Sequence, residues 1–148
     1  MKTGLLPFLL MMLPLQAFAG ADVASPIAQC TTSLKGSKIE AGALLVDPIM
    51  FVAAVDGTKI ERAKKKWDVG LCVEPGERQI DIGFLQAQYI GNAAATYEFL
   101  EGHSYEVAFR GTWRTGFVFW LRDLTTGEDV TTETPMPRKN VSMFRFRP

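Results

Sequence analysis

The stretch WDVGLCVEPGERQIDIGF, residues 67–84, decides the fold class of this chain. Both of its halves alternate between apolar and other side chains, which is typical of β-strands that bury one face. Between them, Pro75-Gly76 is a turn signal, because proline fixes φ and glycine adopts positive φ at little steric cost. The stretch therefore predicts two short strands joined by a turn. Its expected core-facing residues after the turn are Ile80, Ile82 and Phe84.

The same kind of pattern continues on both sides of this stretch. Asp56-Gly57 predicts a tight hairpin turn, since both positions must tolerate positive φ. Further strands are expected at residues 38–46, 50–55, 96–100, 104–110, 117–124 and 140–146, with a loop of small residues at 91–95. The best helix candidate, residues 59–67, is basic and only about two turns long. We therefore expect an all-β fold, a single antiparallel β-sandwich of about seven to nine short strands.

The first nineteen residues, MKTGLLPFLLMMLPLQAFA, have the order of a secretory signal peptide. Lys2 precedes an apolar run that ends in the small-x-small motif Ala17-Phe18-Ala19. The run is shorter than the roughly 20 apolar residues of a bilayer span, and two prolines interrupt it. A lipoprotein signal is disfavoured, because Cys30 lies well past the run. We expect cleavage near Ala19, with Ala21 as the alternative, and a periplasmic or secreted product.

Three regions follow from these patterns. Residues 1–19 are the expected signal peptide, residues 20–37 a loose N-terminal arm, and residues 38–148 the β-sandwich domain. The arm is rich in small and polar residues and shows no periodicity. No later stretch is long and apolar enough to span a bilayer, so we expect no integral membrane segment after signal cleavage.

The charge of the chain argues against a nucleic-acid partner. The sequence has 16 basic and 16 acidic residues. A near-neutral chain has no general attraction for nucleic acid or for an anionic membrane. One segment, Arg62-Ala63-Lys64-Lys65-Lys66, is locally basic. We interpret it as a solvated loop between two strands, and the alternative is a contact with a phosphate or a lipid headgroup.

The two cysteines, Cys30 and Cys72, both follow the predicted cleavage site. In an oxidising compartment an even pair usually forms a disulfide. The alternation around Cys72 turns its side chain away from the core, where it can meet the N-terminal arm. We therefore predict a Cys30–Cys72 disulfide, and two unpaired thiols are the alternative.

Aromatic residues supply the best candidate contact surface. Residues 117–124 are almost all apolar, and one face of this strand suits a core. Trp120 and Arg122 fall on the other face, and an outward face that carries Trp and Arg is typical of contact surfaces. Together with Trp113 they form the candidate partner-binding set. The alternative is that a second sheet and the arm bury both faces.

The sequence contains no motif for catalysis or metal binding. His103 is the only histidine, and a metal site needs three or four converging ligands. Carboxylates gather near Asp123 and near Glu98, but nothing in the sequence makes two of them face each other across a cleft, as glycoside hydrolysis requires. We therefore expect no catalytic residue, no metal site and no cofactor.

Three phrases and one further segment resemble a known kind of module. They are VDG at residues 55–57, VEPGERQIDI at 73–82 and FLEGHSYEVAF at 99–109, followed by DLTTGEDV at 123–130. Together they resemble the small exported β-sandwich modules of the PEGA-like kind, and a set of uncharacterised bacterial envelope proteins. The resemblance covers residues 39–130, although Glu77-Arg78 stands where such modules often carry Gly-His or Glu-His. It implies a β-sandwich in an exported bacterial setting and carries over no catalytic residue, because those modules are mostly structural or binding units.

These observations favour an exported, non-enzymatic module that binds or scaffolds in the bacterial cell envelope. Its expected partner is an unknown protein or envelope component. One alternative is a small envelope hydrolase that uses loop carboxylates. Another is a subunit of an envelope complex in which a partner covers the Trp120 face.

Overall fold

The computed structural model describes residues 30–41, 46–87, 89–112 and 114–140. The expected signal peptide, residues 20–29 of the expected arm, Trp113 and all but Asn140 of the last expected strand lie outside this part of the chain. No helix in the described part is long and apolar enough to cross a membrane.

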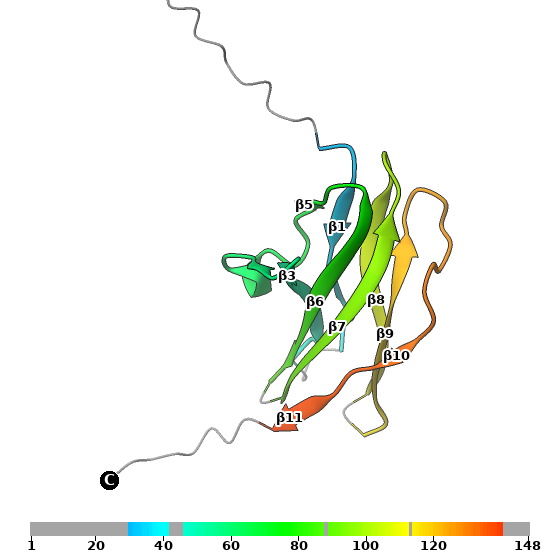
Figure 1. Ribbon diagram of the computed structural model, residues 1–148. Coiled ribbons are helices and arrows are strands. Elements are labelled where there is room, and N and C mark those ends of the chain that lie inside the picture. Colours follow the sequence, from blue (N-terminus) through cyan, green and yellow to red (C-terminus); the bar gives the residue numbers. More distant parts are fainter. Residues whose placement is uncertain (1–29, 42–45, 88, 113, 141–148) are drawn as a thin grey trace, which may run out of the picture.

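The described chain is all-β, as expected, and its strands form two sheets (Figure 1). Sheet A has the spatial order β10 (Thr134–Pro135), β9 (Gly116–Asp123), β8 (Ser104–Thr112), β1 (Ser33–Lys35) and β5 (Leu71–Cys72). Sheet B has the order β11 (Arg138–Asn140), β7 (Tyr89–Phe99), β6 (Gly76–Gln86), β3 (Ile49–Val55) and β2 (Ser37–Lys38), and β4 (Thr58–Lys59) pairs with β3. The described residues thus contain eleven strands rather than seven to nine. The additional strands are only two or three residues long, too short to give a periodic pattern.

β6 and β7 form the long hairpin of sheet B. Ile80, Ile82 and Phe84 on β6 are at most 1% exposed, which confirms the alternation of the deciding stretch. Residues 91–95, however, lie inside β7 and do not form the expected loop. Their small size serves close packing rather than a turn, since a Cβ on Gly91 would collide with the Met136 side chain and the Pro137 carbonyl.

The segment expected to be a loose arm contributes a strand inside sheet A. β1 runs parallel to β8 and antiparallel to β5, so the sheet is mixed and the expectation of purely antiparallel pairing is wrong. The side chain of Leu34 is fully buried, and Lys35 forms an ion pair with Glu106 at 3.3 Å. A three-residue strand with one buried side chain leaves no periodic trace in the sequence, which is why it reads as an arm.

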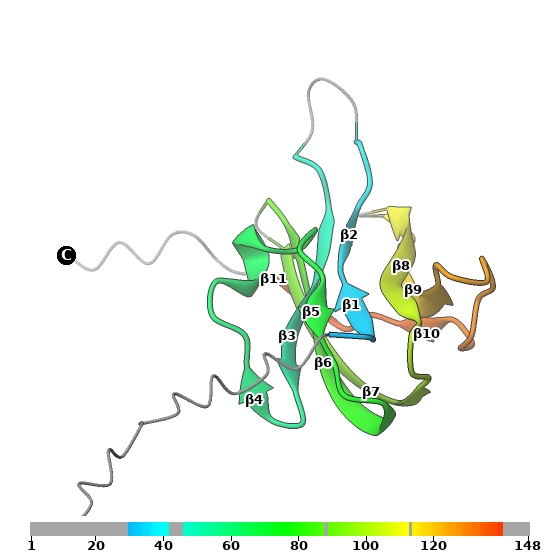
Figure 2. The same cartoon turned by 90° about the horizontal axis from the view of Figure 1, so that it is seen from above.

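The expected strand at residues 67–73 is reduced to the two residues of β5. The Val69 amide donates to the Lys66 carbonyl at 3.0 Å, so the chain turns there, and Val69 is 51% exposed. The helix candidate before it is reduced to the 3-10 turn η1 (Ala63–Lys65). In both views η1 stands on the side of β3 that is remote from β8 and β9 (Figures 1 and 2).

The two sheets face each other across one apolar core. Seen from above, β3 and β6 lie on one side, and β8 and β9 lie on the other (Figure 2). The ring of Phe84 in sheet B meets Phe117 in sheet A at a centroid distance of 4.4 Å, and Phe99 meets Tyr105 edge to face at 5.0 Å. The buried cluster consists of Leu34, Met50, Val52, Val73, Ile80, Ile82, Phe84, Phe99, Tyr105, Val107, Phe109, Phe117, Phe119, Leu121 and Met136.

Candidate functional site

Trp120 and Arg122 lie on the outer face of β9, as the alternation predicts. Trp120 is nevertheless only 9% exposed, and its indole Nε1 donates a hydrogen bond to Asp129 Oδ1 at 2.7 Å. The indole therefore has its only hydrogen-bond donor satisfied inside the protein. Trp120 thus has an internal hydrogen-bonding role in the structure, whereas its role in binding a partner stays a prediction.

Arg122 is held by the same carboxylate. Its Nε donates to Asp129 Oδ1 at 2.7 Å, and its guanidinium lies 5.9 Å from the Trp120 ring centroid. The hydrogen bond from Arg122 is the main cause that lowers the pKa of Asp129 below its ordinary value. Asp129 thus ties together two of the three residues expected to bind a partner. The third, Trp113, lies outside the described residues.

His103 and Asp123 form a pair that the sequence did not reveal. His103 Nδ1 lies 2.6 Å from Asp123 Oδ2, and the other carboxylate oxygen accepts the backbone N–H of Thr125 at 2.8 Å and of Thr126 at 3.3 Å. Burial raises the pKa of Asp123, which is 2% exposed, but the hydrogen bonds from His103 and the two amides outweigh burial and lower it. The run Asp123-Leu124-Thr125 is the one available signal, because an aspartate often bonds to a backbone amide two residues later.

This pair has the beginning of a catalytic arrangement but not its nucleophile. In a triad, the histidine contacts a serine or cysteine. Among the described residues, His103 has no side-chain hydrogen bond to a serine or a cysteine; the neighbouring Ser104 Oγ accepts one from Ser33 Oγ at 3.0 Å. Within the described ranges, no three His, Cys, Asp or Glu side chains are grouped as they would be to hold a metal ion. The loop carboxylates Asp123 and Asp129 both bond to side chains of the protein itself.

The two cysteines meet where they were expected to. Cys30 and Cys72 lie at disulfide-bonding distance, with their Cα atoms 5.4 Å apart. Cys72 is exposed, as its outward phase predicts, and it pairs with Ser33 in the ladder between β1 and β5. The pair therefore fastens the segment that enters β1 to β5.

An open pocket of about 490 Å³ lies on the outer face of sheet B, between β3 and the loop that carries η1. This size is within the range of about 300–1,000 Å³ that small-molecule sites have. Its floor is apolar and consists of Phe51, Ala53, Ala54, Ile60 and Ala63. We call it the β3–η1 pocket.

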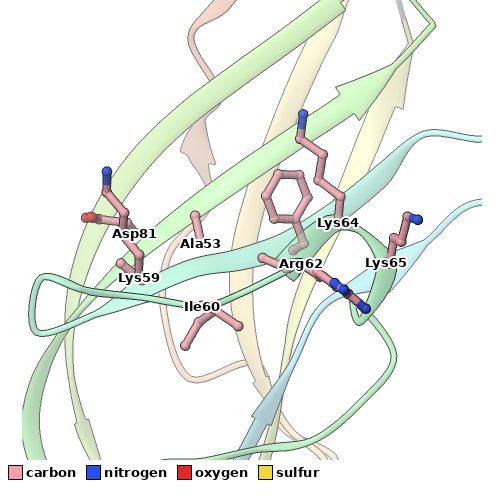
Figure 3. Close-up of a pocket in the computed structure, with 10 residues that line it drawn as sticks. Ala53, Lys59, Ile60, Arg62, Lys64, Lys65 and Asp81 are labelled. Atoms are coloured by element: carbon pink, nitrogen blue, oxygen red, sulfur yellow. The ribbon is translucent and has the colours of Figure 1, made fainter.

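The rim of the β3–η1 pocket is basic. Lys59, Arg62, Lys64 and Lys65 line it, and Asp81 is its only acidic residue. Figure 3 shows Lys64 and Lys65 at one end, and Lys59 and Asp81 at the other. Among the described residues, the side chains of the three lysines have no hydrogen bond or ion pair, and Arg62 contacts the exposed Glu61 at 3.7 Å. Three unpaired cations thus surround an apolar floor.

Two backbone features shape this pocket. A bulge at Ala53 interrupts the register between β3 and β6, and the Ala53 carbonyl accepts the Ile60 amide at 2.9 Å, which holds the loop beside the strand. Arg62 has φ 57°, in the left-handed region, and its carbonyl accepts the amides of Lys65 and Lys66. The tight turn that results buries Ala63 and leaves the η1 lysines exposed.

A second depression, of about 400 Å³, continues the outer face of sheet B toward β7. It shares Ala53 and Asp81 with the β3–η1 pocket, so the two adjoin. Its remaining lining residues are Ile82, Asn92, Ala93 and Ala94. The two pockets form one shallow trough that crosses β3, β6 and β7.

The sequence indicated only half of this site. The basic segment at residues 62–66 is visible in the sequence, where its charge pattern favours a solvated loop. The apolar floor did not stand out, because it is built from outward positions of separate strands. The only signal was that Phe51, Ala54 and Gly83 are apolar or small where a solvent-facing strand usually carries polar residues.

Comparison of the chain with protein-family models, with curated proteins and with solved structures finds no match.

Proposed function

We propose that this chain is an exported, non-enzymatic β-sandwich module of the bacterial cell envelope that binds its partner in the β3–η1 pocket. One observation carries the proposal: an apolar floor on the outer side of a sheet, surrounded by lysines that have no partner in the part of the chain that the structure describes. The outer face of an antiparallel sheet is ordinarily polar. An apolar pocket with a few converging polar groups is the usual form of a binding site.

Export and architecture have separate support. The first nineteen residues have the order of a signal peptide, and the Cys30–Cys72 pair at disulfide distance suits an oxidising compartment. The two sheets with a shared core support a β-sandwich, which is also what the PEGA-like resemblance implies.

The other hypotheses have less support. A partner that covers the Trp120 face would meet an indole N–H that is already bonded to Asp129, and neither Trp120 nor Arg122 lines the two pockets described above. For the hydrolase alternative, two of the loop carboxylates already have internal partners, since Asp129 bonds to Arg122 and Asp123 to His103.

The test is a nuclear magnetic resonance titration of the chain that begins at Gly20, with fractions of a bacterial envelope extract. We expect at least one fraction to shift the backbone amides of Ala53, Ala54 and Asp81. Ala53→Phe fills the pocket floor and should abolish these shifts. Thr96→Phe introduces the same ring on an exposed position of β7 outside the pocket lining and should retain them. Shifts that survive in Ala53→Phe, or no shift with any fraction, would overturn the proposal.

A further inference from the structure

We infer that the β3–η1 pocket takes a monomeric, single-chain anionic amphiphile, with its anionic group at the η1 lysines and its hydrocarbon chain on the apolar floor. The inference rests on the proposed function and names the class of ligand. Both halves of such a molecule have a matching surface in the pocket.

The charge of the rim selects an anion. Lys64 and Lys65 extend from η1 at one end of the pocket and have no partner among the described residues (Figure 3). Lysine presents a compact charge on a flexible stem, which suits a headgroup without fixed geometry. The chain as a whole has equal numbers of basic and acidic residues, so this positive potential is local to the pocket.

Asp81 sets the direction of the ligand. It lines the pocket at the end opposite Lys64 and Lys65 (Figure 3). An anionic headgroup at that end would meet the Asp81 carboxylate as well as Lys59, whereas at the η1 end it meets cations alone and is attracted more strongly. The hydrocarbon chain therefore starts at η1 and runs along the floor toward β6.

The floor has room for a chain rather than for a compact apolar group. Phe51, Ala54 and Ala63 supply buried apolar surface next to the lysines. The adjoining depression continues past Ala53 to Ala94 on β7. Since neighbouring strands lie about 5 Å apart, the trough extends roughly 10 Å from β3 to β7.

The shape of the site favours a free molecule over a membrane surface. Proteins that attach to a bilayer present apolar side chains that project into it, between or beside cations. Here the apolar side chains lie at the bottom of a pocket: Phe51 and Ala54 are 7% and 4% exposed. A ligand must therefore leave the bilayer to bury its chain in this pocket.

Isothermal titration calorimetry of the chain that begins at Gly20 with octanoate tests the inference. We expect saturable one-site binding that weakens as salt is added, because exposed charges are screened. Octyl glucoside, which has a similar chain and no charge, should bind at least about tenfold more weakly. Acetate and inorganic phosphate, which lack the chain, and octyltrimethylammonium, which has the opposite charge, should not bind.

Matched variants locate the two halves of the ligand. The double variant Lys64→Glu/Lys65→Glu should weaken octanoate binding by at least about tenfold, since two attractive charges become repulsive. Lys66→Glu changes the same charge in the same loop outside the pocket lining and should have a clearly smaller effect. Asp81→Asn should tighten binding, and a thermal melt of each variant verifies that it folds.

Three calorimetric results would overturn the inference: no saturable binding of octanoate, equal affinity for octyl glucoside, or no effect of the Lys64→Glu/Lys65→Glu reversal. A fourth comes from a sedimentation assay with phosphatidylglycerol vesicles: binding to these vesicles in place of monomeric octanoate would also overturn it. Suppose that octanoate shows no binding while an extract fraction still shifts the pocket amides of the wild type and not those of Ala53→Phe. In that case the ligand class is wrong and the proposed function of the pocket stands. If both fail, both are wrong.

Discussion

Phe51 on β3 packs its ring against the backbone of Gly83, its direct cross-strand neighbour on β6. A Cβ on Gly83 would overlap three atoms of that ring. The pair explains why a glycine occupies the middle of a central strand, where it ordinarily weakens the sheet. It also places a 7% exposed aromatic ring in the floor of the β3–η1 pocket.

Gly83→Ala should therefore lower the free energy of unfolding by about 1–3 kcal/mol, the usual cost of overpacking. The reduced entropy of the unfolded chain works in the opposite direction but is smaller, about 0.4–1 kcal/mol. Denaturant unfolding measures the change, and Phe51→Leu/Gly83→Ala should recover part of the loss, because the two positions are coupled. Asn92→Ala, on the exposed neighbour of Gly83 in β7, should stay within about 0.5 kcal/mol. A neutral Gly83→Ala would show that the ring moves aside freely.

A second prediction concerns the cysteine pair. Replacing Cys72 by Ala should lower the free energy of unfolding by about 2–4 kcal/mol, since the crosslink closes a loop with a sequence separation of 42. Cys30→Ala should cost the same, and the double variant no more than either single one. Thiol labelling of the denatured, unreduced protein should find no free thiol. Two labelled cysteines, or additive losses in the double variant, would mean that no disulfide forms.

Trp120→Ala should lower the free energy of unfolding by about 3–5 kcal/mol, because it removes a covered ring. Trp120→Phe keeps most of the ring but loses the hydrogen bond to Asp129 and should cost less. Glu133→Ala, on an exposed residue that pairs with Arg110, is the surface control and should stay within about 1 kcal/mol. A small loss in Trp120→Ala, with its melting curve unchanged, would restore the face of Trp120 as a candidate contact surface.

The fold was predictable where burial alternates over several residues. The alternating pattern predicts that Ile80, Ile82 and Phe84 point into the core, because side chains at every second position of a strand share one face. β1 was not predictable, since the buried neighbours of Leu34 at alternate positions are Thr32 and Gly36, which give no apolar alternation. Its place beside β8 depends on pairing across a sequence separation of about seventy residues, which local patterns do not encode.

The candidate sites also differ in how much of each can be predicted from the sequence. Trp120 could be placed on the outer face, but its partner Asp129 lies across a turn, and alternation does not say what covers a side chain. His103 and Asp123 belong to different strand ends and meet only because β8 and β9 pair. The lysines of the β3–η1 pocket are visible in the sequence as a charge cluster. The floor of the pocket depends on the bulge at Ala53, and no residue type in the sequence predicts that bulge.

The last prediction concerns acid stability and the buried carboxylate of Asp123. Its pKa in the folded protein lies below the ordinary value of 3.8, because His103 and the amides of Thr125 and Thr126 bond to the charged form. The stability that this carboxylate contributes is therefore fully present above about pH 3.8 and is lost as the pH falls through the lower folded pKa. Burial raises the pKa of the nearby Tyr97 to about 12, so this tyrosine stays neutral in this range.

Asp123→Asn should remove this dependence. Near neutral pH the variant should be less stable than the wild type by about 1–3 kcal/mol, because its amide replaces a charged acceptor in a buried position. The difference should shrink as the pH is lowered below 3.8, which urea unfolding at a series of pH values measures. Asp68→Asn, on an exposed residue in the turn before β5, should follow the wild type throughout. His103→Gln separates the contribution of the imidazole ring, since glutamine keeps a hydrogen-bond donor without the ring. If the curves of wild type and Asp123→Asn run parallel down to acid pH, the carboxylate is not held in its charged form by these bonds.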